Sequence, residues 1–418
     1  MKLPVTLRAL QYRNFQLFFG GQMISLIGTW MQNVAEAWLV YRLTGSSVML
    51  GGIGFSSQIP SFLFSPLAGI VADRYSRRRV VIATQTSAML LAFVLSGLVL
   101  SGAVRIWHVF VLASLLGVVN AFDIPARQSF MVEMVGRNDL MNAIALNSSM
   151  FNASRVVGPA IAGILVASIG EGWCFFANAV SYIAVIAGLL LMRLPPYEKV
   201  KHEASPLAHI IEGFRWVIHN TPVHAILMLL GVLSLTGLPY LVLMPIFADR
   251  ILHGGATALG TLMGATGVGA LTGALLLASR KSLRGLGRWI AISAASFGVC
   301  LIAFAFSHWY WVSLAILVPV GFTMMIEMGS SNTLIQSMVP DRLRGRVMSV
   351  YAMMFMGMGP IGSLVAGYAA DRIGAPETVA VGGVVCIAAA ATFGIFLPKF
   401  REHARRLISE QQLAPARE

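Results

Sequence analysis

Long apolar runs, separated by short polar stretches, make up most of this chain. Twelve runs can be distinguished, and most reach the roughly 20 residues that a helix needs to cross a bilayer. They cover 15–40, 48–72, 80–100, 107–134, 140–169, 173–194, 223–247, 258–278, 289–306, 309–338, 347–370 and 378–397. The pattern predicts an all-α membrane protein with twelve transmembrane helices.

The runs fall into two sets of six that a constant offset of 204 residues relates. Gly117 corresponds to Gly321 and Gly163 to Gly367, with no gap between these points. Duplication explains such a series of aligned glycines better than chance does. We therefore divide the chain into an N-terminal six-helix half, a cytoplasmic linker, a C-terminal six-helix half and a cytoplasmic tail. Their predicted bounds are 1–194, 195–222, 223–397 and 398–418.

The linker and the tail have patterns of their own. Ser205 and Pro206 have the form of a helix N-cap and a first-turn proline. Apolar residues then recur at helical spacing from Leu207 to Ile218. This pattern predicts an amphipathic helix on the cytoplasmic membrane surface. The tail after Leu397 is basic, and we expect it to be poorly ordered.

Composition indicates that lipid is the solvent of this chain. It is 57% hydrophobic and 11% charged over 418 residues, whereas a soluble domain carries about 25% charged residues. The first run is too long for a signal-peptide core and lacks a small-residue cleavage site, so we expect it to remain as a helix. Cys174, Cys300 and Cys386 lie in separate runs. They suggest neither a disulfide framework nor a metal site, and we predict no metal and no cofactor.

The net charge of +13 is explained by topology. If the N-terminus is cytoplasmic, most of the 30 Lys and Arg residues fall on the cytoplasmic side, as the positive-inside rule requires. The exceptions are Arg42, Arg105, Arg250 and Arg372 on the outer side, and Arg127 and Arg155 within runs. The basic charge is therefore not a nucleic-acid footprint. We predict a multi-pass protein of the inner (cytoplasmic) membrane with both termini in the cytoplasm.

Five ionisable residues lie inside the predicted spans, where a charge costs at least a few kcal/mol and so points to function. They are Glu36, Asp123, Arg127, Arg155 and Glu327. Asp123 and Glu327 are 204 residues apart and hence equivalent, which suggests a site at the interface between the halves. Three carboxylates against two guanidinium groups leave at least one acid without a partner. Such an acid can take up a proton near neutral pH.

Glu36 is the first candidate for the proton-binding acid, because it lies toward the outer end of its run. Gln32 and Asn33 precede it at helical spacing and could line a wet path, and Asn120 adds an amide in another run. The alternative for Glu36 is a side chain that reaches water at the outer interface.

The remaining membrane charges also have two interpretations. Asp123 and Arg127 are four residues apart on one helix face, so they can pair. This pair is either part of a transport site or a structural clamp, helped by the kink expected at Pro125. Arg155 needs an acid, a carbonyl or an anionic substrate as its partner.

The polar segment between the second and third runs carries Gly69, Asp73, Arg74, Arg77 and Arg78. It resembles the signature G-x-x-x-D-R-x-G-R-R/K of the major facilitator superfamily, with a serine at the second glycine. We place Asp73 at the start of the third helix, where a helix N-terminus favours an anion. The resemblance implies a gating element whose arginines pair in one state of the cycle. A further basic segment, 341–346, is expected to be a loop between the tenth and eleventh runs.

The fifth run carries Gly158, Pro159 and Gly163. They lie in a segment similar to the antiporter signature G-x-x-x-G-P-x-x-G-G, with other small residues at two of its glycines. The stretches 13–35 and 120–128 resemble the enterobactin-exporter-like branch of the superfamily. These resemblances imply the major facilitator fold, with two six-helix bundles, and a proton-driven exporter of drugs or siderophores.

We therefore predict a secondary active transporter that exports small molecules by proton-coupled alternating access, and we expect a monomer. An uptake permease and a non-transporting membrane sensor are the alternatives. No G-x-x-x-x-G-K-[ST] loop is present, which excludes direct ATP drive by this chain. The H-E-x-x-H and G-x-S-x-G motifs are also missing, so no enzyme and no catalytic residue is predicted.

Overall fold

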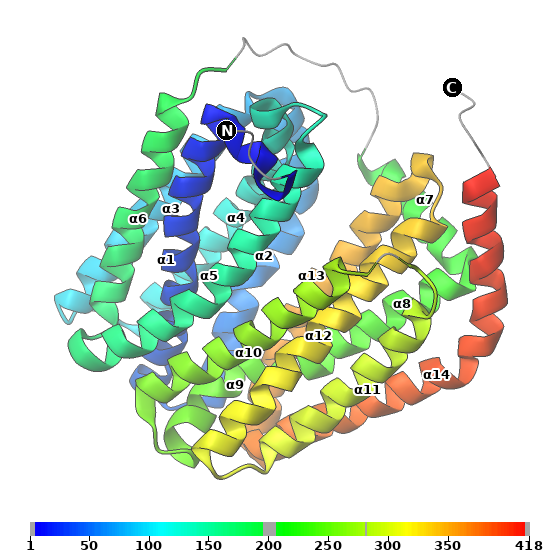
Figure 1. The fold of residues 1–418 in the computed structure, drawn as a ribbon. Helices are drawn as coiled ribbons and strands as arrows, with labels where there is room; N and C mark the ends of the chain where they lie inside the picture. Colours follow the sequence, from blue (N-terminus) through cyan, green and yellow to red (C-terminus); the bar gives the residue numbers. More distant parts are fainter. Residues whose placement is uncertain (1–4, 195–205, 281, 414–418) are drawn as a thin grey trace. The chain divides into compact units, whose positions relative to one another are not determined.

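The computed structural model describes residues 5–194, 206–280 and 282–413. Every regular element in these ranges is a helix (Figure 1). The first part of the chain forms η1 (Val5–Gln11), α1 (Arg13–Thr44), α2 (Ser47–Arg74), α3 (Arg77–Leu100), α4 (Ile106–Val135), α5 (Leu140–Ile169) and α6 (Glu171–Leu191). The second part forms α7 (Pro206–His219), α8 (Thr221–Val232), η2 (Leu233–Gly237), α9 (Tyr240–Ile246), η3 (Phe247–Ile251), α10 (Gly255–Ala278), α11 (Leu286–Ala305), α12 (Tyr310–Met338), α13 (Asp341–Ile373) and α14 (Ala375–Leu413).

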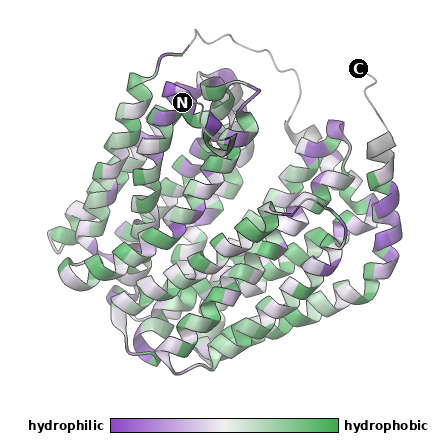
Figure 2. Ribbon diagram, viewed as in Figure 1, coloured by the Kyte–Doolittle hydropathy of each residue, from purple (hydrophilic) through white to green (hydrophobic). Residues whose placement is uncertain are grey.

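Lipid offers no hydrogen-bond partners to the backbone, so each segment that crosses the membrane forms a helix and satisfies its own polar groups. Among the described residues, 11 helical spans are long and apolar enough to cross a membrane, and α8 to η3 together form one of them. Figure 2 shows apolar residues along most of the helices. The twelfth predicted run, 15–40, lies in α1, which has the length to span but is less apolar than the others.

Equivalent turns in the two parts of the chain share one conformation. Gly170 joins α5 to α6 with φ 90° and ψ 167°. Gly374 joins α13 to α14 with φ 96° and ψ 154°. Both lie in a region that glycine adopts readily and other residues rarely do. The two glycines are 204 residues apart, so the turn repeats with the offset found in the sequence.

The chain divides into two compact units by its backbone contacts. Unit 1 comprises Met1–His202 and Pro245–Gly264, and unit 2 comprises Glu203–Met244 and Ala265–Glu418. In unit 1, α1 packs on α6 and α5, α2 packs on α4, and α3 packs on α6 and α4. In unit 2, α11 packs on α14 and α12, and α7 packs on α13. The sequence boundaries of the halves, linker and tail stay a prediction.

Three local expectations are wrong. Residues 398–413 continue α14 as a helix. Pro398 does not end it, and Phe400 contacts the rings of Phe393 and Phe396 across the proline. Residues 341–346 form the first turns of α13 instead of a loop. Asp73 lies in the last turn of α2 and not at the start of α3.

The first part of the predicted linker, 195–205, lies outside the described residues, and α7 occupies the part that follows. Gly213 of α7 lies so close to α13 that an added Cβ atom would come within 2.7 Å of the Arg346 carbonyl oxygen. Glu212 forms ion pairs with Arg342, at 3.8 Å, and with Arg346. Helix α7 is therefore fixed to the beginning of α13 within unit 2.

Candidate functional site

Asp123 is the most fully hydrogen-bonded carboxylate in the described spans. This residue of α4 is almost completely buried, at 3% exposure. Oδ1 accepts hydrogen bonds from Thr84 Oγ1 at 2.8 Å and from Gln85 Nε2 at 2.9 Å, both on α3. Arg127 Nε lies 3.2 Å from Oδ2, one turn along α4. Both carboxylate oxygens have partners, which offsets part of the cost of burying this group.

Thr84 and Gln85 were missed by reasoning from the sequence. They begin a stretch of four consecutive polar residues, 84–87, in a mostly apolar run, which was the available signal. Their partner could not be inferred, because it depends on the rotation of α3 against α4. The predicted pairing of Asp123 with Arg127 is present, and it joins a four-residue polar cluster between the two helices.

Glu36 lies half-buried on α1, next to a polar contact between α1 and α6. Gln32, one turn earlier, has its side-chain oxygen occupied by Asn178 Nδ2 at 2.7 Å. Its amide nitrogen is left for other partners, and Glu36 follows one turn further along α1. Ser181 donates to Asn178 Oδ1 at 3.1 Å. No ion pair among the described side chains involves Glu36.

The other candidates in unit 1 have distinct environments. The Arg155 guanidinium carbon on α5 lies 5.7 Å from the centre of the Trp30 ring on α1, a cation–π distance. Asn33 is exposed and Asn120 is half-buried. Asp123 therefore contacts α3, whereas Arg155 contacts α1.

Glu327 lies in unit 2, on α12, and is 1% exposed. Ser331 Oγ donates to its Oε1 at 2.9 Å. No ion pair among the described side chains involves Glu327. Ser330, the residue before this donor, is completely buried, and its hydroxyl has no hydrogen-bond partner among the described residues. Asp123, the equivalent residue in the other half of the sequence, has a guanidinium neighbour. The environments of the two carboxyl groups therefore differ.

Two arginines of the signature segment, in the first turn of α3, contact two other helices. Arg77 Nη1 lies 2.6 Å from Glu133 Oε1 on α4. Arg78 Nη2 donates to the Leu190 carbonyl oxygen on α6 at 3.0 Å. Arg74 is exposed. The side chains at Gly69 and Asp73 lie outside the described part of the structure, so the predicted role of Asp73 stays a prediction.

The antiporter-like segment provides close helix packing. A Cβ atom on Gly158 would lie 2.5 Å from the Cβ atom of Trp30 and 2.8 Å from the Ile27 carbonyl oxygen, both on α1. On Gly163 it would lie 3.1 Å from the Cα atom of Gly260 on α10. Pro159 is buried within α5. Small residues allow such approaches, and these two glycines bring α5 against α1 and α10.

A second polar contact in unit 1 joins α1 to η3, and sequence reasoning did not find it. Tyr41 donates to Asp249 Oδ2 at 2.7 Å. Arg250 Nη2 donates to the Gly45 carbonyl oxygen at 2.8 Å, and its guanidinium carbon lies 5.7 Å from the Tyr41 ring centre. The contact joins segments about 200 residues apart, which no local pattern could pair.

Two solved transporter structures share this fold. The nucleoside transporter NupG superposes with a TM-score of 0.70 at 14% identity, covering 94% of this chain and 99% of that one. A bacterial homologue of the iron transporter ferroportin, in an inward-facing state, gives a TM-score of 0.69 at 19% identity, covering 94% and 98%. At this identity the likeness shows the fold alone: the chain has the fold of major facilitator transporters.

Sequence comparison defines the family. A family model described as transmembrane secretion effector matches residues 5–416. The staphyloferrin A transporter of Staphylococcus aureus is 28% identical over 377 residues, covering 88% of this chain and 93% of the relative. The multidrug efflux pump Tap of Mycolicibacterium fortuitum is 30% identical over 383 residues, covering 88% and 92%. The chain belongs to the transmembrane secretion effector family and is a multi-pass export transporter.

Proposed function

We propose that this protein exports small organic molecules of the siderophore or drug type in exchange for protons. The protein works as a monomer in the inner membrane, with both termini in the cytoplasm. It moves its substrate without covalent chemistry and without a cofactor. The names of its relatives, a staphyloferrin A transporter and multidrug efflux pumps, support this substrate class.

The difference between Asp123 and Glu327 is the observation that carries proton coupling. Both carboxyl groups are buried at equivalent positions of the sequence repeat. Asp123 has a guanidinium neighbour and two further donors, whereas Glu327 has a hydroxyl donor and no ion pair among the described side chains. Burying a carboxylate without a cation costs several kcal/mol. A proton removes that cost, so Glu327 is suited to bind and release one.

Alternating access turns this proton into a driving force. A proton enters from the outside and a substrate from the inside, and each leaves on the opposite side. One charge crossing 100 mV supplies about 2.3 kcal/mol, enough for roughly a fiftyfold substrate gradient at full coupling. Glu36 is the second candidate proton carrier. Gln32, which accepts a hydrogen bond from Asn178, lies one turn before Glu36 on α1.

Two variants test this assignment in inverted vesicles that contain the full-length protein. An acidic interior should drive uptake of a fluorescent cationic drug, and a protonophore should abolish it. We expect Glu327→Gln to reduce pH-driven accumulation at least tenfold while retaining exchange of labelled for unlabelled drug. Asp371→Asn is the matched control, because this carboxyl group is exposed near the end of α13.

Two outcomes would overturn parts of the proposal. Accumulation that a protonophore leaves unchanged would reject proton coupling altogether. Normal pH-driven accumulation by Glu327→Gln, together with its loss in Glu36→Gln, would transfer the proton-carrying role to α1.

A further inference from the structure

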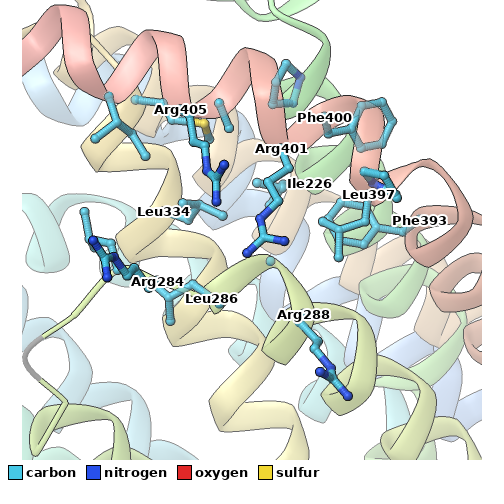
Figure 3. A pocket seen from close by; sticks show the side chains of 18 of the residues that line it. Ile226, Arg284, Leu286, Arg288, Leu334, Phe393, Leu397, Phe400, Arg401 and Arg405 are labelled. Carbon is cyan, nitrogen blue, oxygen red and sulfur yellow. The ribbon is translucent and has the colours of Figure 1, made fainter.

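A large cavity in unit 2 lies apart from every residue discussed as a transport site. Its volume is about 1260 Å³, and it lies between the beginning of α11, the end of α14 and the neighbouring ends of α8 and α12 (Figure 3). The loop 282–285 before α11 forms one wall, and the part of α14 that follows Pro398 forms another. The unexpected helical extension of α14 therefore builds one side of the cavity.

The charge in this cavity has one sign. Four arginines line it, whereas its described lining contains no Asp or Glu. They are Arg284, Arg288, Arg401 and Arg405. Figure 3 shows Arg401 and Arg405 reaching from α14 toward α11, while Arg288 points away. None of the ion pairs among the described side chains uses these arginines. The cavity thus gathers positive charge that the protein itself does not neutralise.

The helix end beside these arginines has the same polarity. Helix α11 is 20 residues long, and its N-cap is Gly285, which has no side chain to accept from the first backbone N–H groups. The Leu286 and Arg288 N–H groups donate to the Leu283 and Gly285 carbonyl oxygens, which leaves the Gly287 N–H and the helix dipole to favour an anion at this end. An anion between α11 and α14 would meet the positive end of the helix from one side and guanidinium groups from the other.

The remaining wall is apolar. Ile226, Leu334, Phe393, Leu397 and Phe400 line the cavity and lie on α8, α12 and α14. All five lie in helical spans that are long and apolar enough to cross a membrane. A ligand that fits must combine an anionic group with a hydrocarbon part. A small hydrophilic anion would leave the apolar wall without a contact.

We propose that this cavity binds an anionic phospholipid of the bilayer. The phosphate lies between Arg401, Arg405 and the beginning of α11, and the acyl chains lie along Leu334, Phe393 and Leu397. Arginine suits this role because its planar donor fork matches two phosphate oxygens at once. The bound lipid would connect α14 to α11 and α12 at the basic end of unit 2.

Native mass spectrometry of the detergent-purified full chain tests the proposal without a transport assay. The probes are phosphatidylglycerol and phosphatidylcholine with identical acyl chains. We expect phosphatidylglycerol to bind more tightly. The double variant Arg401→Gln/Arg405→Gln should weaken its binding about thirtyfold, from the usual contribution of two basic groups near an anionic lipid.

The matched control is Lys399→Gln/Arg406→Gln. It removes two charges from the same helix at exposed positions that do not line the cavity, and its lipid affinity should stay within about twofold of wild type. Arg284→Gln, in the loop before α11, provides a second variant that leaves α14 intact. It should weaken phosphatidylglycerol binding as well, and size-exclusion profiles verify that each variant is folded.

Three results would overturn the proposal. Equal loss in the test and control pairs would mean that general charge attracts the lipid. Equal binding of the two lipids would mean that the arginines do not select an anion. Displacement of phosphatidylglycerol by millimolar inorganic phosphate, or phosphate binding with the same arginine dependence, would assign the cavity to a free anion.

Discussion

Asp123 illustrates how the protein keeps a charge inside the membrane. Its carboxylate lies beside Thr84, Gln85 and Arg127, and donors reach both of its oxygens. Removing one partner of a buried pair exposes the other to the full cost of desolvation. Arg127 retains 22% side-chain exposure, so water offsets part of that cost.

A double-mutant cycle tests this account. We expect Asp123→Asn to lower the free energy of unfolding by about 2–3 kcal/mol, because it leaves Arg127 without its counter-ion. Arg127→Gln should cost a similar amount. The double variant should cost clearly less than the sum of the two, as expected for residues in direct contact. Thermal or denaturant unfolding in detergent provides the measurement, and strictly additive effects would contradict the pairing.

Single residues also mark the limit of prediction from sequence. The pair Asp123–Arg127 followed from its spacing within one helix. The donors Thr84 and Gln85 did not, because their position depends on how α3 packs on α4. Glu327 was found through the repeat, but only the structure separates its environment from that of Asp123. Residue type and periodicity identify a membrane charge, and tertiary packing decides its partners.

At the scale of elements, equivalent glycines fix helix pairs in both units. A Cβ atom on Gly117 of α4 would lie 2.5 Å from the Ser57 carbonyl oxygen of α2. In unit 2, Gly321 of α12 lies directly against the Thr266 carbonyl group of α10. Without a hydrophobic force between helices in lipid, such close approach is a main source of packing energy. The repeat therefore preserves a packing contact as well as a sequence.

Gly321→Ala should disrupt this contact, because backbone atoms of α10 occupy the space that its Cβ atom needs. We expect a loss of about 1–3 kcal/mol in unfolding free energy, in the range for overpacked sites. Gly345→Ala in α13 is the control, since nothing lies within 4 Å of the added atom. There the higher helix propensity of alanine should stabilise the protein by about 0.5–1 kcal/mol. Equal effects of the two substitutions on the melting temperature would refute this packing argument.

Elements were predicted well where lipid dictates them and less well at their ends. The twelve apolar runs correspond to the long helices because a bilayer tolerates few other structures. Hydropathy alone could not show that α13 begins at Asp341 or that α14 continues to Leu413. Both extensions are polar. Glu212 of α7 contacts the first, and aromatic rings of α14 itself, on both sides of Pro398, support the second.

At the scale of the whole molecule, the chain crosses from unit 2 into unit 1 between Met244 and Pro245. The segment that enters unit 1 carries Asp249 and Arg250, which bind Tyr41 and Gly45 at the end of α1. By the predicted topology this contact lies on the outer side. In the alternating-access mechanism that we propose, the outer side opens for substrate release. We therefore expect the α1–η3 contact to break once in each transport cycle.

Substitutions at this contact should favour the open state. A hydrogen bond to a charged group contributes about 1.5–3 kcal/mol, so Asp249→Asn or Tyr41→Phe should raise amide hydrogen exchange in η3 and at the end of α1 roughly tenfold or more. Arg372→Gln is the matched control, because its guanidinium group binds Tyr368 within the same helix, α13. Exchange that rises equally in the control would indicate general loosening of the outer surface. Exchange unchanged in both Asp249→Asn and Tyr41→Phe would mean that this contact does not hold the outer side closed, and a different set of residues would have to do so.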